Sequence, residues 1–297
     1  MNILSINAPL SVGISHVPQL HVKEGTVLVE VHACGICGGD LTFYKEGIST
    51  YPYFGHEFSG VVRDVSSASN DLQPGDRVTT GLIETCGICS ACSVGRPNFC
   101  EKVQCSFTPG GFAEQCLVTY TSGSKTLLKL PDSMNFTTAT LHEPLSCALR
   151  IVKQAAPQAG DTVLVIGLGA MGVLSGMLLK QIYSVASLVG VDTNQHRLKS
   201  AESLGFDLLF TSKEVVAGKL KTFAPGFDIV VDATGVPEVL QQAIDAVRLG
   251  GTVILAGVPQ GSCDFTPLPL FRKEITVKGA KGPFPYTTNR GSSLALD

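Results

Sequence analysis

Short apolar runs and helical stretches alternate along the second half of the chain. The apolar runs number six and lie at residues 162–166, 187–191, 207–210, 228–231, 252–256 and 275–278. Helical stretches such as 193–204 and 237–248 separate them. This alternation predicts a parallel sheet with helices on both faces, and six strands complete an α/β doubly wound dinucleotide-binding domain.

The first half of the chain has a different pattern. Its short β-type runs lie at residues 26–31, 59–65, 77–79 and 114–118, and turns rich in glycine, proline and polar residues separate them. This pattern is typical of a mostly β domain of the partly open barrel kind. We therefore expect a β domain at 1–145, a dinucleotide-binding domain at 146–280 and a short tail at 281–297.

A glycine turn follows the first apolar run of the second half, in the stretch VLVIGLGAMG that begins at Val163. Gly167 permits a tight turn, Gly169 lets the backbone approach a pyrophosphate, and Gly172 lets the following helix pack on the strand. The next apolar run ends in Asp192, 20 residues after Gly172. Its carboxylate can accept both ribose hydroxyls and would repel a 2′-phosphate, which favours NAD over NADP. The alternative is a helix-packing turn in another α/β protein.

Further cofactor contacts are expected where the fourth and fifth runs end, because such sheets bind ligands at the carboxyl ends of their strands. The predicted cofactor-binding residues are Gly167, Gly169, Ala170, Met171, Gly172, Asp192, Arg197, Thr234, Gly235 and Val258.

Composition and charge narrow the class of partner. The net charge is −3 and charged residues make up 16% of the chain, so nothing indicates nucleic acid or an anionic membrane as a partner. No apolar run is long enough to span a bilayer, and the N-terminus lacks the pattern of a secretory signal. We therefore expect a cytoplasmic protein, in which ten cysteines indicate metal binding more than disulfides.

One cysteine cluster has the spacing of a structural zinc site. The stretch CGICSACSVGRPNFC places Cys86, Cys89, Cys92 and Cys100 on one short loop. Four thiolates suit a tetrahedral zinc with no open position, which favours a structural role over catalysis. The loop holds few apolar residues and would hardly fold without the metal. Disulfides and an iron–sulfur cluster are the alternatives.

A second, open metal site is assembled from three separate segments. Their sequences are CGICGGD, GHEFSG and HEPLSC, and their candidate ligands are Cys34, Cys37, Asp40, His56, Glu57, His142, Glu143 and Cys147. None of these segments is specific alone, because a single histidine is more often a satisfied polar group, and Cys34 and Cys37 could form a thiol–disulfide pair. One thiolate, one imidazole and one carboxylate would together leave a fourth position open, as in catalytic zinc sites.

These motifs, in this order, make the chain resemble the zinc-containing medium-chain alcohol and polyol dehydrogenases. The resemblance covers residues of about 20 to 280, and it includes the open-site motifs, the four-cysteine loop and the glycine turn. The sorbitol, threonine and sugar-acid branch is the most similar, since Glu143-Pro144-Leu145 replaces the cysteine of the simple alcohol branch. The resemblance implies a GroES-like catalytic β domain followed by a Rossmann domain.

The resemblance also implies roles for single residues. Cys37 and His56 match the first two ligands of the catalytic zinc, and Glu57 and Glu143 match the carboxylates of this branch, whose order the sequence leaves open. Asp40 matches the carboxylate that orients His56 through its other ring nitrogen, with a plain surface aspartate as the alternative. Cys34 matches a non-ligand position, so we assign it to packing.

The implied activity is hydride transfer between a secondary alcohol, such as a polyol or sugar acid, and NAD, with two zinc ions per chain. Two features depart from the family. Gly39 occupies a position that usually carries a serine or threonine hydroxyl of the proton relay, and only about 19 residues follow the last apolar run. The second feature predicts a β domain that lacks its C-terminal return, and with it weakened stability.

The rival hypotheses are an NAD-binding, zinc-stabilised protein with little or no activity, and a zinc-free reductase of the same superfamily. Cys37, His56 and Glu143 together argue against the zinc-free reductase. Neither nucleic acid nor membrane is expected as a partner, and the resemblance implies a homodimer or homotetramer.

Overall fold

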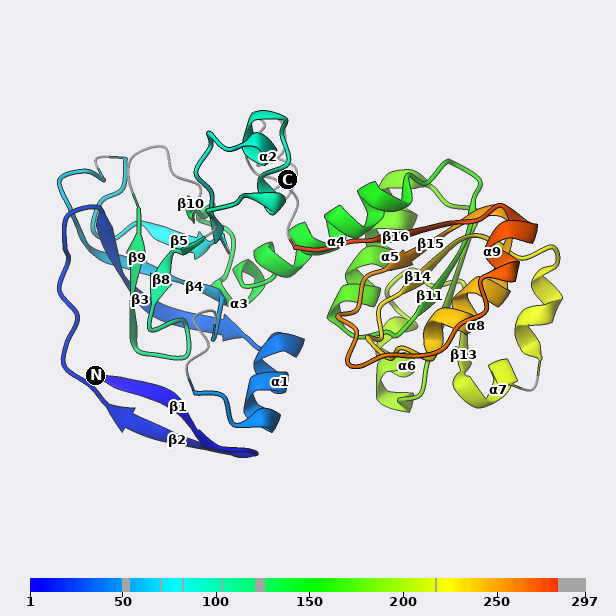
Figure 1. Ribbon diagram of the computed structural model, residues 1–297. Coiled ribbons are helices and arrows are strands. Elements are labelled where there is room, and N and C mark those ends of the chain that lie inside the picture. The colour runs from blue at the N-terminus through cyan, green and yellow to red at the C-terminus, as the bar shows by residue number, and fades with distance from the viewer. Residues whose placement is uncertain are drawn as a thin grey trace. The chain divides into compact units, whose positions relative to one another are not determined.

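The computed structural model describes residues 1–49, 54–69, 71–81, 83–102, 104–120, 126–216 and 218–282. Most of the tail predicted at 281–297 therefore lies outside the described residues. The chain forms two compact units, and the boundary between them falls after Glu143, in the first turn of helix α4 (His142–Ala155) (Figure 1). None of the helices among the described residues has the length and apolar character needed to cross a bilayer.

The first unit is mostly β. Its strands are β1 (Asn2–Ala8), β2 (Ser11–His16), β3 (Thr26–Gly35), β4 (Glu57–Val65), β5 (Arg77–Thr80), β6 (Ile83–Glu84), β7 (Gln104–Cys105), β8 (Phe107–Thr108), β9 (Gln115–Thr119) and β10 (Leu127–Lys129). Its helices are α1 (Gly38–Glu46), α2 (Ser90–Ser93), α3 (Phe136–Ala139) and the 3-10 turn η1 (Pro97–Phe99).

Six of these strands form one antiparallel sheet in the order β10-β5-β4-β3-β9-β8. Alternate positions of β3 face inward, so that Val27 and Val29 are fully buried with Phe58 of β4 and Val118 of β9. The edge strands β10 and β8 lie at opposite ends of this order, which gives the partly open barrel that the sequence predicts.

The second unit is the α/β domain. Its strands are β11 (Thr162–Ile166), β12 (Ser187–Asp192), β13 (Leu208–Thr211), β14 (Phe227–Asp232), β15 (Val247–Leu255) and β16 (Thr276–Gly279). Its helices after α4 are α5 (Ala170–Tyr183), α6 (Gln195–Ala201), α7 (Ser212–Val216), η2 (Lys219–Phe223), α8 (Val239–Ala246) and α9 (Leu268–Lys273). All the pairings are parallel, and the order β13-β12-β11-β14-β15-β16 is that of a doubly wound sheet.

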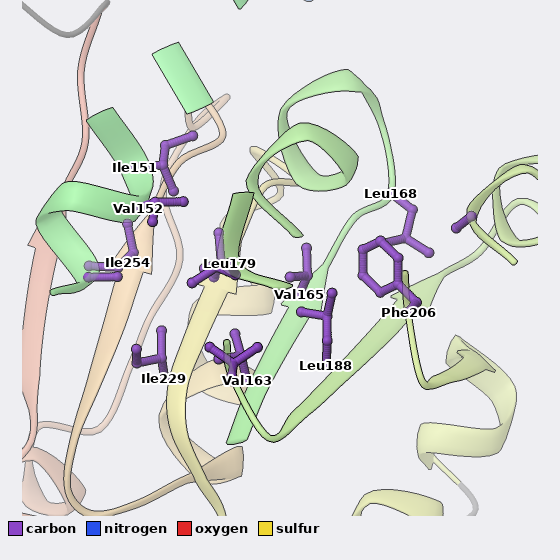
Figure 2. Close-up of a cluster of buried hydrophobic side chains, with 14 of the residues drawn as sticks. Ile151, Val152, Val163, Val165, Leu168, Leu179, Leu188, Phe206, Ile229 and Ile254 are labelled. Atoms are coloured by element: carbon purple, nitrogen blue, oxygen red, sulfur yellow. The ribbon is translucent and has the colours of Figure 1, made fainter. Parts of the chain in front are cut away.

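Helices cover both faces of this sheet because the side chains of the central strand alternate. Val163 and Val165 of β11 pack with residues of α4, α5 and α6, including Ile151 and Leu179 (Figure 2). The intervening Leu164 of β11 packs on the other face, in a cluster that includes residues of α8. A parallel strand buried on both faces is a continuous apolar run in the sequence, as in β11 and β12, whereas the edge strands β13 and β16 are half-buried or exposed.

The boundary between α8 and β15 differs clearly from the sequence prediction. The helical stretch expected to reach residue 248 ends at Ala246 as α8, because Val247 already pairs with Phe227 of β14. The strand then passes through an irregularity and continues to Leu255. Gly250 has a φ of 69° in this segment, a backbone conformation that glycine adopts without strain.

Candidate functional site

Three side chains from two separate segments of the first unit converge on one point. The sulfur of Cys37, a ring nitrogen of His56 and a carboxylate oxygen of Glu57 all lie within 4.8 Å of one another. Thiolate, imidazole and carboxylate are the ligand types of zinc, and three protein ligands leave a fourth tetrahedral position open. The donor set and its spacing therefore fit a catalytic zinc.

Strand register brings the two segments together. Antiparallel pairing of β3 with β4 places Gly35 opposite Glu57, so that the loop after β3 begins beside the ligands that open β4. A side chain at Gly35 would overlap the Glu57 carboxylate and displace it from its present position. Sequence reasoning missed Gly35; its place two residues before Cys37 was the available signal.

Helix α1 fixes the cysteine of this group. Cys37 is the N-cap of α1, and its sulfur accepts a hydrogen bond from the Gly39 N–H at 3.4 Å. Asp40 completes the capping box by accepting the Cys37 N–H at 2.9 Å. Cys37 is therefore held by the helix start itself.

Asp40 also links the two segments that carry the ligands. Besides the Cys37 N–H, it accepts the N–H of Gly55, the residue before His56, at 3.2 Å. Its Oδ1 lies 3.9 Å from Nδ1 of His56, and both side chains are buried. The carboxylate thus faces the ring nitrogen proposed from the family resemblance, at a distance longer than a hydrogen bond, while its two backbone bonds set the spacing of the loops.

The acidic surroundings of the site favour a cation. Burial, and next the negative charge of Glu143, raise the pKa of Glu57 to about 7. Glu143 is itself buried at the start of α4 but contributes no atom to the three-residue group found among the described residues. Two carboxylates in a low-dielectric site repel each other, and a bound divalent cation would relieve that repulsion.

The surroundings of Cys34 make it less suited than Cys37 to bind a metal. Burial, together with the charges of Asp40 and Glu57, raises the pKa of the Cys34 thiol well above its usual range. A neutral buried thiol is a poor metal ligand and an adequate packing group. Gly111 packs directly against its sulfur, where a side chain would collide.

The four cysteines of the second cluster lie within 4.8 Å of one another. The sulfur of Cys100 is 3.5 Å from that of Cys86 and 3.9 Å from that of Cys89. These separations are far too long for a disulfide and match the edges of about 3.8 Å expected in a tetrahedron of sulfurs around zinc. Backbone N–H groups lower the pKa of Cys89 to about 6 and lower that of Cys100, whereas burial and the neighbouring thiols raise the pKa of Cys92.

In the second unit, the glycine turn joins β11 to α5. Gly167 has a φ of 92°, and a side chain there would crowd Thr234. A side chain on Gly172 would overlap the carbonyl of Gly167, whereas nothing lies within 4 Å of the position that a side chain would take on Gly169. The turn is thus closed on the protein side and open at Gly169, where a pyrophosphate would approach Ala170 and the start of α5.

Asp192, at the end of β12, turns its carboxylate toward this turn. The side chain is buried and accepts the N–H of Leu168 at 2.7 Å and that of Asn194 at 2.8 Å. Arg197 of α6 approaches it at 3.6 Å. The carboxylate is therefore held at the edge where a ribose would lie beside a phosphate bound at α5.

Met171 lies in the first turn of α5, and the candidates Thr234, Gly235 and Val258 lie at the carboxyl ends of β14 and β15. Gly235 has a φ of 69°, and a side chain there would meet the carbonyl of Val258 at 2.5 Å. Val258 itself is 78% exposed. A pocket of about 130 Å³, lined by Asp232, Gly235 and Gly257 among others, adjoins this turn.

Two family models match the chain. The alcohol dehydrogenase GroES-like domain matches residues 23–132, and the zinc-binding dehydrogenase model matches residues 170–292. Probable D-xylulose reductase A of Aspergillus clavatus is 30% identical over 280 residues, which cover 89% of this chain and 76% of that protein. Sorbitol dehydrogenase of Bacillus subtilis is 32% identical over 256 residues, with coverage of 83% and 72%.

Solved structures agree with these matches. The crystal structure of a protein from Sinorhizobium meliloti 1021, described as a candidate zinc-binding dehydrogenase bound to NADP, superimposes with a TM-score of 0.86 at 28% identity. The match covers 99% of this chain and 88% of that one. The architecture predicted from the sequence, a GroES-like β domain followed by a doubly wound α/β domain, is thereby confirmed.

Proposed function

Because this chain belongs to the zinc-containing medium-chain alcohol and polyol dehydrogenase family, we propose that it transfers a hydride between a secondary alcohol and NAD. The observation that carries the proposal is the convergence of Cys37, His56 and Glu57. Polyols and sugar acids are the proposed substrates, in keeping with the names of the relatives and with Glu143 at the position that distinguishes this branch.

Each residue of the proposed site has a separate task. A zinc ion bound there supplies a Lewis acid that lowers the pKa of the substrate hydroxyl. Cys37, His56 and Glu57 would hold it, and Asp40 keeps the two ligand segments in register through the N–H groups of Cys37 and Gly55. Glu143 is proposed to act on the substrate or a water molecule rather than as a direct ligand, since it lies outside the three-atom group.

The choice of NAD rests on Asp192. Its buried carboxylate, fixed by two backbone N–H groups, would accept ribose hydroxyls and repel a 2′-phosphate. NADP is the alternative, because one structural relative was solved with NADP bound.

Asp192→Ser is expected to raise the KM for NAD about a hundredfold, since it removes a charged acceptor of two hydrogen bonds. The KM for NADP should fall or stay unchanged, because the repulsion is gone. Steady-state kinetics with NAD and with NADP measure the ratio of the two KM values. Asp207→Asn is the matched control: Asp207 also accepts a backbone N–H, from Leu188 at 2.7 Å, but precedes β13 at the opposite end of the sheet. An equal rise of the KM for NAD in both variants would contradict the assignment of Asp192 to ribose binding.

A water relay is proposed to carry the alcohol proton to solvent, since Gly39 has no hydroxyl. Gly39→Ser is then expected to change turnover by less than about tenfold, because a working relay already exists. Gly38→Ser, one position away with open space around it, controls for the added bulk. A gain of about a hundredfold in Gly39→Ser alone, the size of an added acid–base group, would show that the relay is missing.

The proposed function is tested by following NAD reduction with a panel of polyols and sugar acids, with and without a chelator. Turnover that the chelator abolishes and zinc restores supports it. The rival is an NAD-binding protein without turnover, which the missing hydroxyl at Gly39 favours. It predicts binding of NADH with no activity on any member of the panel. The homodimer or homotetramer implied by the family stays a prediction.

A further inference from the structure

We propose that Asp232 is a positioning residue, which holds the turn at 234–235 in the shape that receives the dinucleotide. The proposal rests on the proposed function, because it assigns a role in the same cofactor site. Asp232 was not among the candidate residues, although its place at the end of an apolar run, two residues before Thr234, was visible in the sequence.

The side chain of Asp232 acts on the turn through Thr234. One carboxylate oxygen accepts both the backbone N–H of Thr234 at 3.0 Å and its hydroxyl at 2.7 Å. The Thr234 hydroxyl oxygen in turn accepts the N–H of Val236 at 3.0 Å. A single carboxylate thus fixes the residues on both sides of Gly235, which adopts a positive φ and, having no side chain, would otherwise have wide conformational freedom.

The main chain of Asp232 also forms hydrogen bonds with the loop that follows β15. Its carbonyl oxygen accepts the N–H groups of Ala256 at 2.8 Å and of Gly257 at 3.0 Å. Beyond this point Gln260 donates its N–H to the carbonyl of Gly235 at 3.1 Å. The two loops proposed to flank the cofactor therefore meet at Asp232.

The hydrogen bonds from Thr234 matter because the Asp232 carboxylate that accepts them is buried. Asp232 is 5% exposed, and desolvation raises the pKa of its carboxyl above the usual range. A buried carboxylate without donors is costly, so the bonds from Thr234 are retained in the folded unit. The turn therefore needs no ordering when the cofactor arrives, and preorganisation of this kind appears as tighter binding.

The same strand offers a matched control at its other end. Asp228 of β14 accepts the backbone N–H of Thr162 at 2.7 Å and its hydroxyl at 2.8 Å, again on one oxygen. This aspartate–threonine pair repeats the local chemistry of Asp232 and Thr234 at the amino end of the sheet, away from the carboxyl ends that bind ligands.

The test compares Asp232→Ala and Thr234→Val with Asp228→Ala and Thr162→Val in the full chain. We expect the first pair to weaken NADH binding, measured by fluorescence titration, about tenfold. Thr234→Ser, which keeps the hydroxyl, should bind as the unaltered chain does. The second pair should lower the melting temperature and leave the Kd for NADH unchanged.

A double variant separates positioning from direct contact. If Asp232 works through Thr234, the loss in Asp232→Ala with Thr234→Val should be close to that of either change alone. Fully additive losses, binding within twofold in both single variants, or equal weakening in the Asp228 pair would each overturn the positioning role. Thr234→Val preserves the shape of the side chain and removes only its hydroxyl. It therefore still tests the positioning role if Asp232→Ala fails to fold. An unaltered chain that binds no dinucleotide would instead overturn the proposed function.

Discussion

Cys37→Ala is expected to remove one zinc ion per chain and to lower kcat/KM for the best alcohol by at least about a thousandfold. Only two protein ligands would remain, His56 and Glu57. A Lewis acid supplies several kcal/mol of charge stabilisation in such reactions, and each 1.36 kcal/mol is tenfold in rate. The N-cap of α1 is lost as well, but a sulfur acceptor at 3.4 Å contributes little beside the metal.

Metal content and kinetics measure this result together. The unaltered chain should hold two zinc ions, and Cys37→Ala one. Cys34→Ala is the matched control, because Cys34 lies three residues earlier, is also half-buried and has a thiol kept neutral by its surroundings. It should keep both zinc ions and most of the activity. A Cys37→Ala variant with two zinc ions or normal turnover would refute the assignment of the open site.

Cys100→Ala is expected to cause the largest loss of stability. Cys100 is the buried member of the four-cysteine cluster, and its sulfur also accepts the N–H groups of Cys86 and Lys102. Structural zinc contributes roughly 10 kcal/mol or more in small zinc-dependent modules. If a third of that free energy contributes to the stability of the first unit, its loss should lower the melting temperature by about 10 °C, at roughly 2–4 °C per kcal/mol.

Calorimetry and zinc content check this expectation. Ser93→Ala serves as the control within the same loop, because Ser93 is exposed and its side chain bonds only to the carbonyl of Ser90 among the contacts described. It should retain both zinc ions and melt with the unaltered chain. A Cys100→Ala variant that keeps two zinc ions and its melting temperature would show that these cysteines bind no structural metal.

Most of the α/β unit could be predicted because its information is local. A strand buried on both faces, such as Thr162–Ile166, is a continuous apolar run, and Gly172 in the following turn is required by the carbonyl of Gly167, five residues earlier. The limit of this reasoning appears at Val247, where a helical pattern continues but pairing with Phe227, 20 residues earlier, begins the strand.

The open metal site was only half predictable. Residue types and motif order named Cys37, His56, Glu57 and Glu143 as candidates. They did not distinguish which of the two carboxylates, Glu57 or Glu143, would bind the metal directly. We propose Glu57 as the direct ligand because it belongs to the three-residue group and Glu143 does not, and the register of β3 and β4 places Glu57 opposite Gly35. Such a register depends on packing of the whole sheet, and a shift of one residue would turn Glu57 to the other face.

By itself the sequence determined the family, through the resemblance of its motifs, and the order of the two folds. It also predicted the four-cysteine loop and the types of ligand as candidates, because these depend on residue chemistry and short spacing. Only the tertiary structure decided that Asp40 links the Cys37 and Gly55 backbones, that Gly35 makes room for Glu57, and that Asp232 fastens the turn at Thr234. The physical reason is that buried carboxylates take their roles from donors brought to them by folding, and a linear pattern does not state which donors those are.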